Sequence, residues 1–326
     1  MEVWQKQFVR KLFHYSARHM DIDGAFRIKH LYVPSKLYKY RHFSDNHIGA
    51  LIGGKLWSSS PDRLNDPYEV EFTFDSDRFY VEDISATEFI QKMKRIEADI
   101  KAGGRLEMSA HTRKIKSGEW IEREARQLLS ALNLPDKEDF LAVLQEFLKA
   151  QKNNEVERTT NLLRQGLSVL SLSATPESEL LWSHYSNSHK GFAIEYNFAD
   201  LSPDHPRKRL CFPVFYTKKP RDATFYMARG DFSNFNNLYA QYMLLMKHSQ
   251  WAYEQEWRII HSIGPSHANI ELDMPKPSAV IFGLKSELDG ASEQKVIDFC
   301  KREGIAMKRA THTPGRFGLS IKDHEI

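Results

Sequence analysis

The stretch Trp251-Ala-Tyr-Glu-Gln-Glu-Trp-Arg-Ile-Ile260 gathers carboxylates, an arginine and aromatic rings within ten residues. Glu254 and Glu256 are two residues apart, so in a β-strand both side chains point to the same face. Two like charges so close together are unfavourable unless a cation, a metal ion or a substrate opposes them. Arg258 continues the same parity, which leaves two interpretations open. The three side chains form a structural ladder of ion pairs, or the carboxylates face a cleft and take part in a reaction.

A second group of polar side chains lies in the segment Pro61-Asp-Arg-Leu-Asn-Asp-Pro-Tyr-Glu69. Asn65 and Asp66 precede Pro67, and the residue before a proline is disfavoured in the helical region, so the segment is typical of a turn. Asn and Asp side chains also bond nearby backbone amides. The segment is either a plain connecting turn or a loop that directs Asp66 and Glu69 into a pocket beside the glutamate pair.

A predicted helix over 179–190 carries polar aromatic residues on one face. Leu181, His184 and Tyr185 lie at positions i, i+3 and i+4, which share a face of a helix. His184 is therefore either a structural histidine or a catalytic group. Gly191 is predicted to take a positive φ angle, which glycine permits, where the chain leaves this helix.

The pattern of apolar residues predicts the elements that position these groups. Alternation and β-branched or aromatic content predict strands at 35–41, 55–59, 70–74, 168–173, 192–196, 210–216, 257–260, 278–283, 305–309 and 317–321. Helical spacing predicts one helix within 1–30 and others at 44–53, 238–248 and 293–302. The region 86–165, rich in Lys, Glu and Leu, is typical of helices separated by glycine and proline.

These elements predict an α+β fold with a mixed or antiparallel central sheet, flanking helices and a helical insertion. We divide the chain into an N-terminal helical segment at 1–34, the first part of the α+β core at 35–85, the helical insertion at 86–165, and the rest of the core at 166–326.

Composition excludes several classes of protein. The 326 residues are 41% hydrophobic and 12% aromatic, which suffices for a folded core. A net charge of +3 is too small to indicate nucleic-acid binding by itself, and the two cysteines, Cys211 and Cys300, give no metal or disulfide framework. No signal peptide is recognisable, and no apolar run approaches the ~20 residues that span a membrane. We therefore expect a cytoplasmic protein with no membrane partner and no bound metal.

The chain contains no Walker loop, no dinucleotide-binding glycine motif, and neither HExxH nor GxSxG. It nevertheless resembles a bacterial and phage family of domains of unknown function, number 2971. Four blocks carry that resemblance in the family's order: Leu37–Arg41, Leu56–Glu69, Leu181–Glu195 and Tyr253–Arg258. The family name implies no function. Its bacterial and phage setting implies a toxin or a phage-defence effector.

The order of residues is also similar to that of ADP-ribosyltransferase domains. Tyr40 and Arg41 lie on an early strand, Ser58 begins a hydroxyl block on the next strand, and Glu254-Gln-Glu256 comes late. The spelling Ser58-Ser-Ser60 departs from the family's Ser-Thr-Ser. The resemblance implies that NAD is the substrate and that Arg41 holds its phosphates.

The same resemblance implies roles for the other residues. Glu256 would bond a ribose hydroxyl and stabilise an oxocarbenium-like transition state, and Glu254 would activate the acceptor. Tyr185 or Trp57 would stack on nicotinamide. With His184 as a third catalytic candidate, the expected NAD-binding residues are Tyr40, Arg41, Ser58, Asn65, Asp66, Glu69, Tyr185 and Arg258. The acceptor, which can be a protein, a nucleic acid or a small molecule, is not specified by the sequence.

Two other classes of function stay open. A metal-dependent nuclease would place Mg²⁺ among Asp66, Glu69, Glu195 and Glu256, with Lys39 or Lys190 nearby. A non-enzymatic binding module would use the four blocks as a fold signature and the charged pairs as buried ion pairs.

Overall fold

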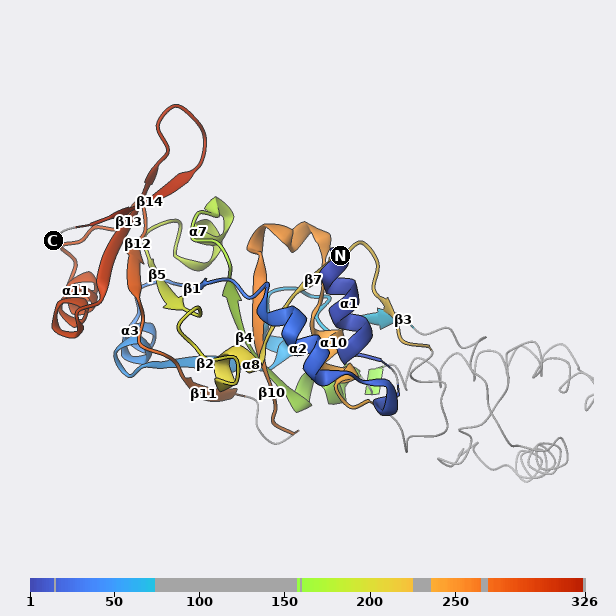
Figure 1. Ribbon diagram of the computed structural model, residues 1–326. Helices are drawn as coiled ribbons and strands as arrows, with labels where there is room; N and C mark the ends of the chain where they lie inside the picture. Colours follow the sequence, from blue (N-terminus) through green and yellow to red (C-terminus); the bar gives the residue numbers. More distant parts are fainter. Residues whose placement is uncertain (15, 74–156, 159, 225–235, 265–268, 325–326) are drawn as a thin grey trace, which may run out of the picture.

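A ten-stranded sheet organises the residues that the computed structural model describes, which are 1–14, 16–73, 157–158, 160–224, 236–264 and 269–324 (Figure 1). Within this sheet the described strands pair antiparallel, except that β12 and β13 are parallel. The predicted α+β class with a mixed sheet is therefore confirmed. The strands are β1 (Lys36–Arg41), β2 (Lys55–Ser59), β4 (Leu167–Ser173), β5 (Phe192–Asn197), β6 (Cys211–Pro213), β10 (Glu256–Ser262), β11 (Asn269–Asp273), β12 (Ala279–Phe282), β13 (Ala306–His312) and β14 (Leu319–Asp323).

Two short parallel pairs and several helices complete the described part of the chain. The pairs are β3 (Phe72–Thr73) with β8 (Arg221–Asp222), and β7 (Phe215–Thr217) with β9 (Met246–His248). The α-helices are α1 (Val3–Leu12), α2 (Ile22–His30), α3 (Asp45–Ile52), α7 (Glu179–Tyr185), α8 (Pro206–Arg209), α10 (Tyr239–Leu244) and α11 (Ala291–Glu303). Short 3-10 helices are η1 (Ala17–His19), η2 (Pro61–Arg63) and η4 (Ser249–Glu254).

Strand β4 is the point at which the sheet divides. Strand β10 pairs along the whole of one edge of β4, from Glu256 opposite Ser173 to Ser262 opposite Leu167. The other edge is shared: β1 pairs with it at Ser173 and β2 pairs with it at Val169. One branch of the sheet then runs β1-β5-β12-β13-β14 and the other runs β2-β11, with α3 joining β1 to β2.

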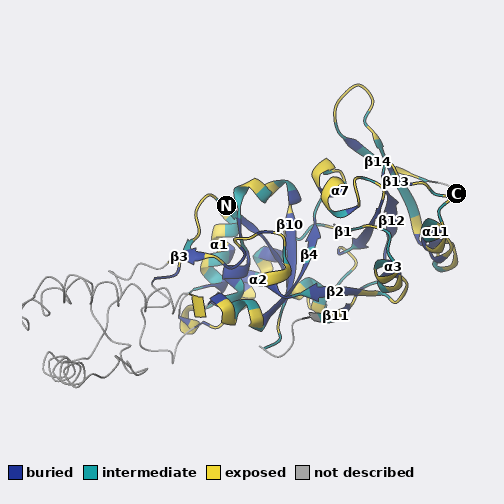
Figure 2. Ribbon diagram, turned by 180° about the vertical axis from the view of Figure 1, so that it is seen from behind, coloured by how far each residue is buried: buried dark blue, intermediate teal, exposed yellow. Residues whose placement is uncertain are grey.

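Apolar residues of two core clusters pack against the two faces of β4 and β10. Leu170 and Ile259 belong to a core cluster that includes residues of α3 and α11. Val169 and Ile260 belong to a second cluster with α1, α2 and α10 on the other side. Figure 2 shows these central strands as buried and the outer surfaces of the helices as exposed. A strand with both faces covered is a rigid base for side chains that project from its end.

The N-terminal region forms two helices where the sequence predicted one. Asp21 interrupts the helical pattern because its carboxylate accepts a hydrogen bond from the Gly24 amide (2.8 Å) and caps α2. Phe8 and Leu12 of α1 are buried against the β10 side of the sheet.

The region between 210 and 262 also differs from the prediction. The strand predicted at 210–216 breaks at Val214 into β6 and β7, and the helix predicted at 238–248 ends at Leu244, after which Met246–His248 forms β9. Pro213 ends β6, which pairs only with β10 among the described strands; this edge position suits proline, which has no amide N–H to donate.

Helix α7 is shorter than predicted, and Gly191 has a different role. The helix ends at Tyr185, and Asn187, Ser188 and His189 take φ angles of 49°, 55° and 70°. Gly191 itself does not have a positive φ angle. A Cβ atom there would overlap the Arg41 carbonyl oxygen, so glycine is needed because the backbones of α7's exit and β1 lie so close.

The predicted insertion at 86–165 lies mostly outside the described residues, and the part of it that is described, 157–158 and 160–165, is helical. The boundaries between the four predicted segments stay predictions.

Candidate functional site

The glutamate pair is assembled by a turn and not by one strand. Glu254 ends η4, Gln255 takes a left-handed φ angle of 44°, and β10 begins only at Glu256. The prediction that both carboxylates share a strand face is therefore wrong. They converge all the same, because Lys247 Nζ donates to Glu254 Oε2 (2.6 Å) and to Glu256 Oε2 (3.0 Å). Lys247 comes from β9 and is buried.

Arg258 is fully buried, and each of its N–H groups has an acceptor. Its Nε donates to Glu256 Oε1 (2.8 Å) and its Nη2 to Glu256 Oε2 (3.1 Å). The same guanidinium bonds Glu69 through Nη1 (2.8 Å) and Nη2 (2.5 Å), and Nη1 also reaches the Leu244 carbonyl (2.5 Å). Five donors are all that an arginine has. Arg258 is therefore a structural cation, and it has no N–H left for a phosphate.

Glu69 is held in place by its loop, as one of the two interpretations of that loop predicted. Its amide donates to the Asp66 carbonyl (3.2 Å), and its own carbonyl accepts from Arg164 Nη2 (3.1 Å). The next residue, Val70, is buried with a φ angle of 65°, an outlier for a β-branched residue. Such strain costs of order 1–3 kcal/mol and persists only when the surrounding contacts fix it.

The charges of this cluster do not balance. Three carboxylates, those of Glu69, Glu254 and Glu256, meet the two cations Lys247 and Arg258. Burial by itself would raise the pKa of Glu256, but Arg258 and Lys247 hold it well below its usual range. Burial raises the pKa of Glu254, and the Glu256 charge adds to this, while Lys247 opposes it. Glu254 is thus the carboxyl group of the pair that most readily holds a proton.

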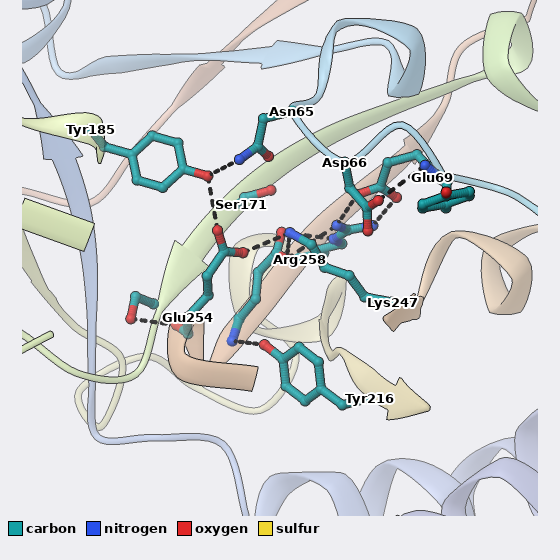
Figure 3. A network of polar contacts seen from close by, with 12 residues as sticks. Asn65, Asp66, Glu69, Ser171, Tyr185, Tyr216, Lys247, Glu254 and Arg258 are labelled. Carbon is teal, nitrogen blue, oxygen red and sulfur yellow. Dashed lines mark hydrogen bonds and ion pairs between the residues drawn. The ribbon is translucent and has the colours of Figure 1, made fainter. Parts of the chain in front are cut away.

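Glu254 is also the end of a hydrogen-bonded chain that leads toward the surface (Figure 3). The Tyr185 hydroxyl donates to Glu254 Oε1 (2.8 Å) and accepts from Asn65 Nδ2 (2.5 Å). Burial and the neighbouring Glu254 raise the pKa of Tyr185, so its hydroxyl stays protonated and can donate. Asn65 comes from the loop after η2 and Tyr185 from α7, so this chain joins the two sides of the site.

These side chains line one cavity of about 860 Å³, at the place where β1 and β2 part from β4. Arg41 lies on its wall together with Glu254 and Glu256, so one bound molecule can contact both regions. The lining residues come from α3 as well as from the strands, and include Tyr38, Lys39, Tyr40, Arg41, His47, Trp57, Asn65, Glu69, Ser171, Tyr185, Lys247, Glu254, Glu256 and Arg258.

The β1 wall carries cations in a different setting from Lys247 and Arg258. Lys39 Nζ donates to the Ser171 carbonyl (2.7 Å), and Arg41 Nη1 lies 3.5 Å from the carbonyl of its neighbour Tyr40. Burial lowers the pKa of Arg41 to about 10, at which it stays charged in neutral solution. Burial, with Arg41 close by, lowers the pKa of Lys39 well below its usual value.

Three of the predicted site residues lie elsewhere. His184 is exposed on α7 and does not line the cavity; its ring centre is 6.4 Å from that of Tyr185. Asp66 is buried outside the lining, and its carboxylate accepts from the Tyr68 amide (3.0 Å), as in a plain turn. Ser58 is buried, and its hydroxyl bonds that of Ser168 (2.6 Å). None of the three side chains lines the cavity, because burial turns Asp66 and Ser58 away from it and the helix phase turns His184 away.

Tyr40 does line the cavity, although its hydroxyl is already engaged. It donates to the Thr175 carbonyl (2.7 Å), and its ring packs edge-on against Trp182 at 5.0 Å between ring centres. Tyr40 would therefore contact a ligand with its aromatic ring and not with its hydroxyl.

Of the four carboxylates of the nuclease alternative, Glu69 and Glu256 meet at Arg258, but Asp66 and Glu195 lie outside the cavity lining. Glu195 bonds Ser278 Oγ (2.9 Å) and pairs with Lys36 (2.8 Å) and Lys308 (3.1 Å), away from the cavity lining. Lys190 is exposed. Among the described residues, no three His, Cys, Asp or Glu side chains are arranged to hold a metal ion.

Lys247 and Ser171 are the site residues that the sequence reasoning did not single out. Lys247 is the one charged residue in Met243-Leu-Leu-Met-Lys247, and such an isolated charge in an apolar run is a usable signal of a buried ion pair. Ser171 carries no such signal. It reaches the site because β4 pairs with β10, which places Ser171 directly opposite Arg258.

Comparison with known proteins adds one match. A family model described as "Protein of unknown function (DUF2971)" matches residues 181–259. This segment includes two of the four blocks on which the sequence resembles that family, and it contributes Tyr185, Lys247 and both glutamates to the cavity. No curated protein and no solved structure matches the chain. Within the described residues, no helix has the length and apolar character needed to cross a membrane.

Proposed function

We propose that this protein is an NAD-dependent ADP-ribosyltransferase, and that in the cell it acts as a toxin or phage-defence effector. The observation that carries the proposal is the shared cavity, with Arg41 on one wall and the Glu254–Glu256 pair on another. Its volume of about 860 Å³ lies within the range of small-molecule sites, roughly 300–1,000 Å³. An arginine suits the diphosphate at the centre of NAD, and carboxylates suit the ribose that carries the nicotinamide.

The geometry favours distinct roles for the two glutamates. Glu256 accepts hydrogen bonds from Arg258 and Lys247 and stays ionised, so it acts as a fixed negative charge that stabilises an oxocarbenium-like ribose. Glu254 has the raised pKa and fewer hydrogen bonds, so it suits the transfer of a proton.

In the proposed reaction the bond between ribose C1′ and the nicotinamide nitrogen breaks, and its electron pair stays with the nitrogen. Nicotinamide leaves as a neutral molecule. A hydroxyl or amine of the acceptor bonds to C1′ and gives its proton to ionised Glu254, which later releases it to water. Tyr185 donates to Oε1 of Glu254, whereas Lys247 donates to Oε2, and these two hydrogen bonds fix the orientation of the carboxylate.

Aromatic side chains on the cavity wall are suited to the rings of NAD. Trp57 is 47% exposed although it lines the cavity, so its indole face is open to a planar group.

A non-enzymatic binding module is the second candidate. The hydrogen bonds of Arg258 favour it, because all five of its N–H groups have protein acceptors and such a buried network can have a purely structural role.

The test is transfer of label from NAD in a chelating buffer. Wild type, Glu254→Gln, Glu256→Gln and the control Glu179→Gln would each be mixed with cell lysate, RNA and DNA. Glu179 is an exposed glutamate on α7. We expect label with wild type and the control, a loss of about 10²–10⁴-fold for Glu254→Gln and about 10²–10³-fold for Glu256→Gln.

Absence of label from folded wild type would refute the transferase. The same samples with Mg²⁺ would then be examined for cleaved nucleic acid, and intact nucleic acid would leave the binding module. Equal labelling by all four proteins would show a reaction that does not use this cavity. Circular dichroism would establish that each variant is folded.

A further inference from the structure

Strand β1 presents two basic side chains to the cavity from one face. Lys39 and Arg41 are two residues apart on this strand and both line the cavity, which the alternation of a strand allows. β1 pairs with β5 along its whole length but with β4 only at Tyr38. Past Tyr38 the edge of β1 therefore opens onto the gap between the two branches of the sheet.

Within the described residues neither of these side chains forms an ion pair with a carboxylate, although Glu256 and Glu254 lie close enough to Lys39 to favour its charged form. Lys247 and Arg258, by contrast, contact two carboxylates each. Lys39 uses one of the three donors of its ammonium group, on the Ser171 carbonyl, and Arg41 makes one long contact of 3.5 Å. Most of the donors on this wall are free to bond a ligand.

We infer that Lys39 and Arg41 together bind a diphosphate group, with the arginine bonding two of its oxygens and the lysine a third. With Lys39 protonated in the complex, the two positive charges match a dianion, and arginine binds phosphate oxygens in pairs. The inference rests on the proposed function in that NAD contains such a group, but binding is measurable without transfer. It gives Lys39 a role beyond holding the Ser171 carbonyl.

The surroundings of Lys39 make this binding depend on pH. Arg41 on β1 and Lys247 on β9 disfavour its charged form, Glu254 and Glu256 favour it, and burial lowers its pKa most of all. His47 of α3 lies near both cations, and burial lowers its pKa to about 4, so it is neutral. A bound dianion raises the pKa of Lys39, so the complex takes up a proton. Affinity falls as the pH rises from the lowered pKa of the free protein toward the higher pKa of the complex.

Isothermal titration of the full chain tests this, with inorganic pyrophosphate, ADP, ADP-ribose and NAD as ligands. Each titration is run in two buffers of different ionisation enthalpy, which reveals proton uptake. We expect wild type to bind and, at a pH between the pKa of Lys39 in the free protein and its pKa in the complex, to take up a proton. Lys39→Met should bind about 10–100-fold more weakly, the loss of a charge-assisted hydrogen bond, and without proton uptake. Arg41→Gln should also bind weakly but keep the proton uptake.

Two further variants separate a ligand contact from a structural effect. Lys39→Arg keeps the charge and can still reach the Ser171 carbonyl, so it should bind well and take up no proton, because guanidinium is charged throughout. Lys36→Met is the matched control: Lys36 is on the same strand, pairs with Glu195 and does not line the cavity, so binding should be unchanged.

Binding by inorganic pyrophosphate alone would identify the free anion as the ligand, and binding by ADP and NAD but not pyrophosphate would show that the nucleoside is also required. Failure of every ligand to bind folded wild type, or unchanged affinity of Lys39→Met, would overturn the inference. Ligand binding that depends on Lys39, without any transfer from NAD, would uphold it and refute the proposed function. Transfer from NAD by Lys39→Met with an unchanged KM for NAD would support the proposed function and refute the role of Lys39 in binding.

Discussion

Replacing Arg258 by methionine would test whether the buried charges are one network. The substitution keeps an unbranched side chain of similar length but removes five hydrogen bonds, to Glu69, Glu256 and the Leu244 carbonyl. It leaves two carboxylates without the cation that they share. Breaking a buried ion pair from one side costs about 3–5 kcal/mol, because the remaining charge is buried without a partner. We expect a loss of that size in the free energy of unfolding.

The double variant Arg258→Met/Glu69→Gln makes the test specific. If Arg258 stabilises mainly by neutralising buried carboxylates, then removing one of those charges restores part of the loss. The double variant should be more stable, by at least about 1 kcal/mol, than the sum of the two single changes predicts, which is within the range of coupling energies for contacting residues.

Urea unfolding followed by tryptophan fluorescence and by far-ultraviolet circular dichroism would measure these values, and coincident curves would support two-state treatment. Arg302→Met is the control, because the Arg302–Glu303 pair is exposed and should have no measurable effect. Additivity of the two changes within about 0.5 kcal/mol would refute the network, since independent sites behave in that way.

Further predictions concern Glu254 and two glycines. Because the pKa of Glu254 is raised in the folded protein, its contribution to stability is fully present below the ordinary pKa of glutamic acid, about 4.3, and is lost as the pH rises through the raised value. Wild type should therefore lose stability relative to Glu254→Gln as the pH of urea titrations is increased from about 4, and a constant difference would contradict this. Gly191→Ala should destabilise by about 1–3 kcal/mol, because its methyl group meets the Arg41 carbonyl and β1 must shift. Gly49→Ala on α3, where no atom lies within 4 Å of the added Cβ, should instead stabilise by about 0.5–1 kcal/mol in the same thermal or urea measurement.

The elements with local signals were predictable from the sequence. Strand β1, helix α3 with its Ser44 cap, and strand β2 follow one another as expected, because their capping, alternation and glycine signals lie within each segment. α11 and β12 were likewise predicted. β11 was missed, and it exists because it pairs with β2 more than two hundred residues earlier in the chain.

The candidate site was predictable only in part. Glu69, Arg41, Asn65 and Tyr185 reach the cavity as expected, but the two glutamates do so for another reason than strand parity. The left-handed Gln255 brings Glu254 beside Glu256, and no feature of a glutamine announces this conformation. Lys247, Ser171 and the division of the sheet at β4 depend on pairings between distant segments, which local patterns do not encode.

The central place of β4 also governs when this cavity can form during synthesis. The strands that pair with β4 are made both early, at 36–41 and 55–59, and late, at 256–262. A nascent chain that has reached residue 173 has a mainly apolar strand with one edge still uncovered. The next 89 residues, from 173 to 262, take roughly 5–20 s at the usual rates of translation. During that interval the uncovered edge can pair with another chain, and a ribosome-bound fragment that ends before Glu254 contains no assembled carboxylate pair.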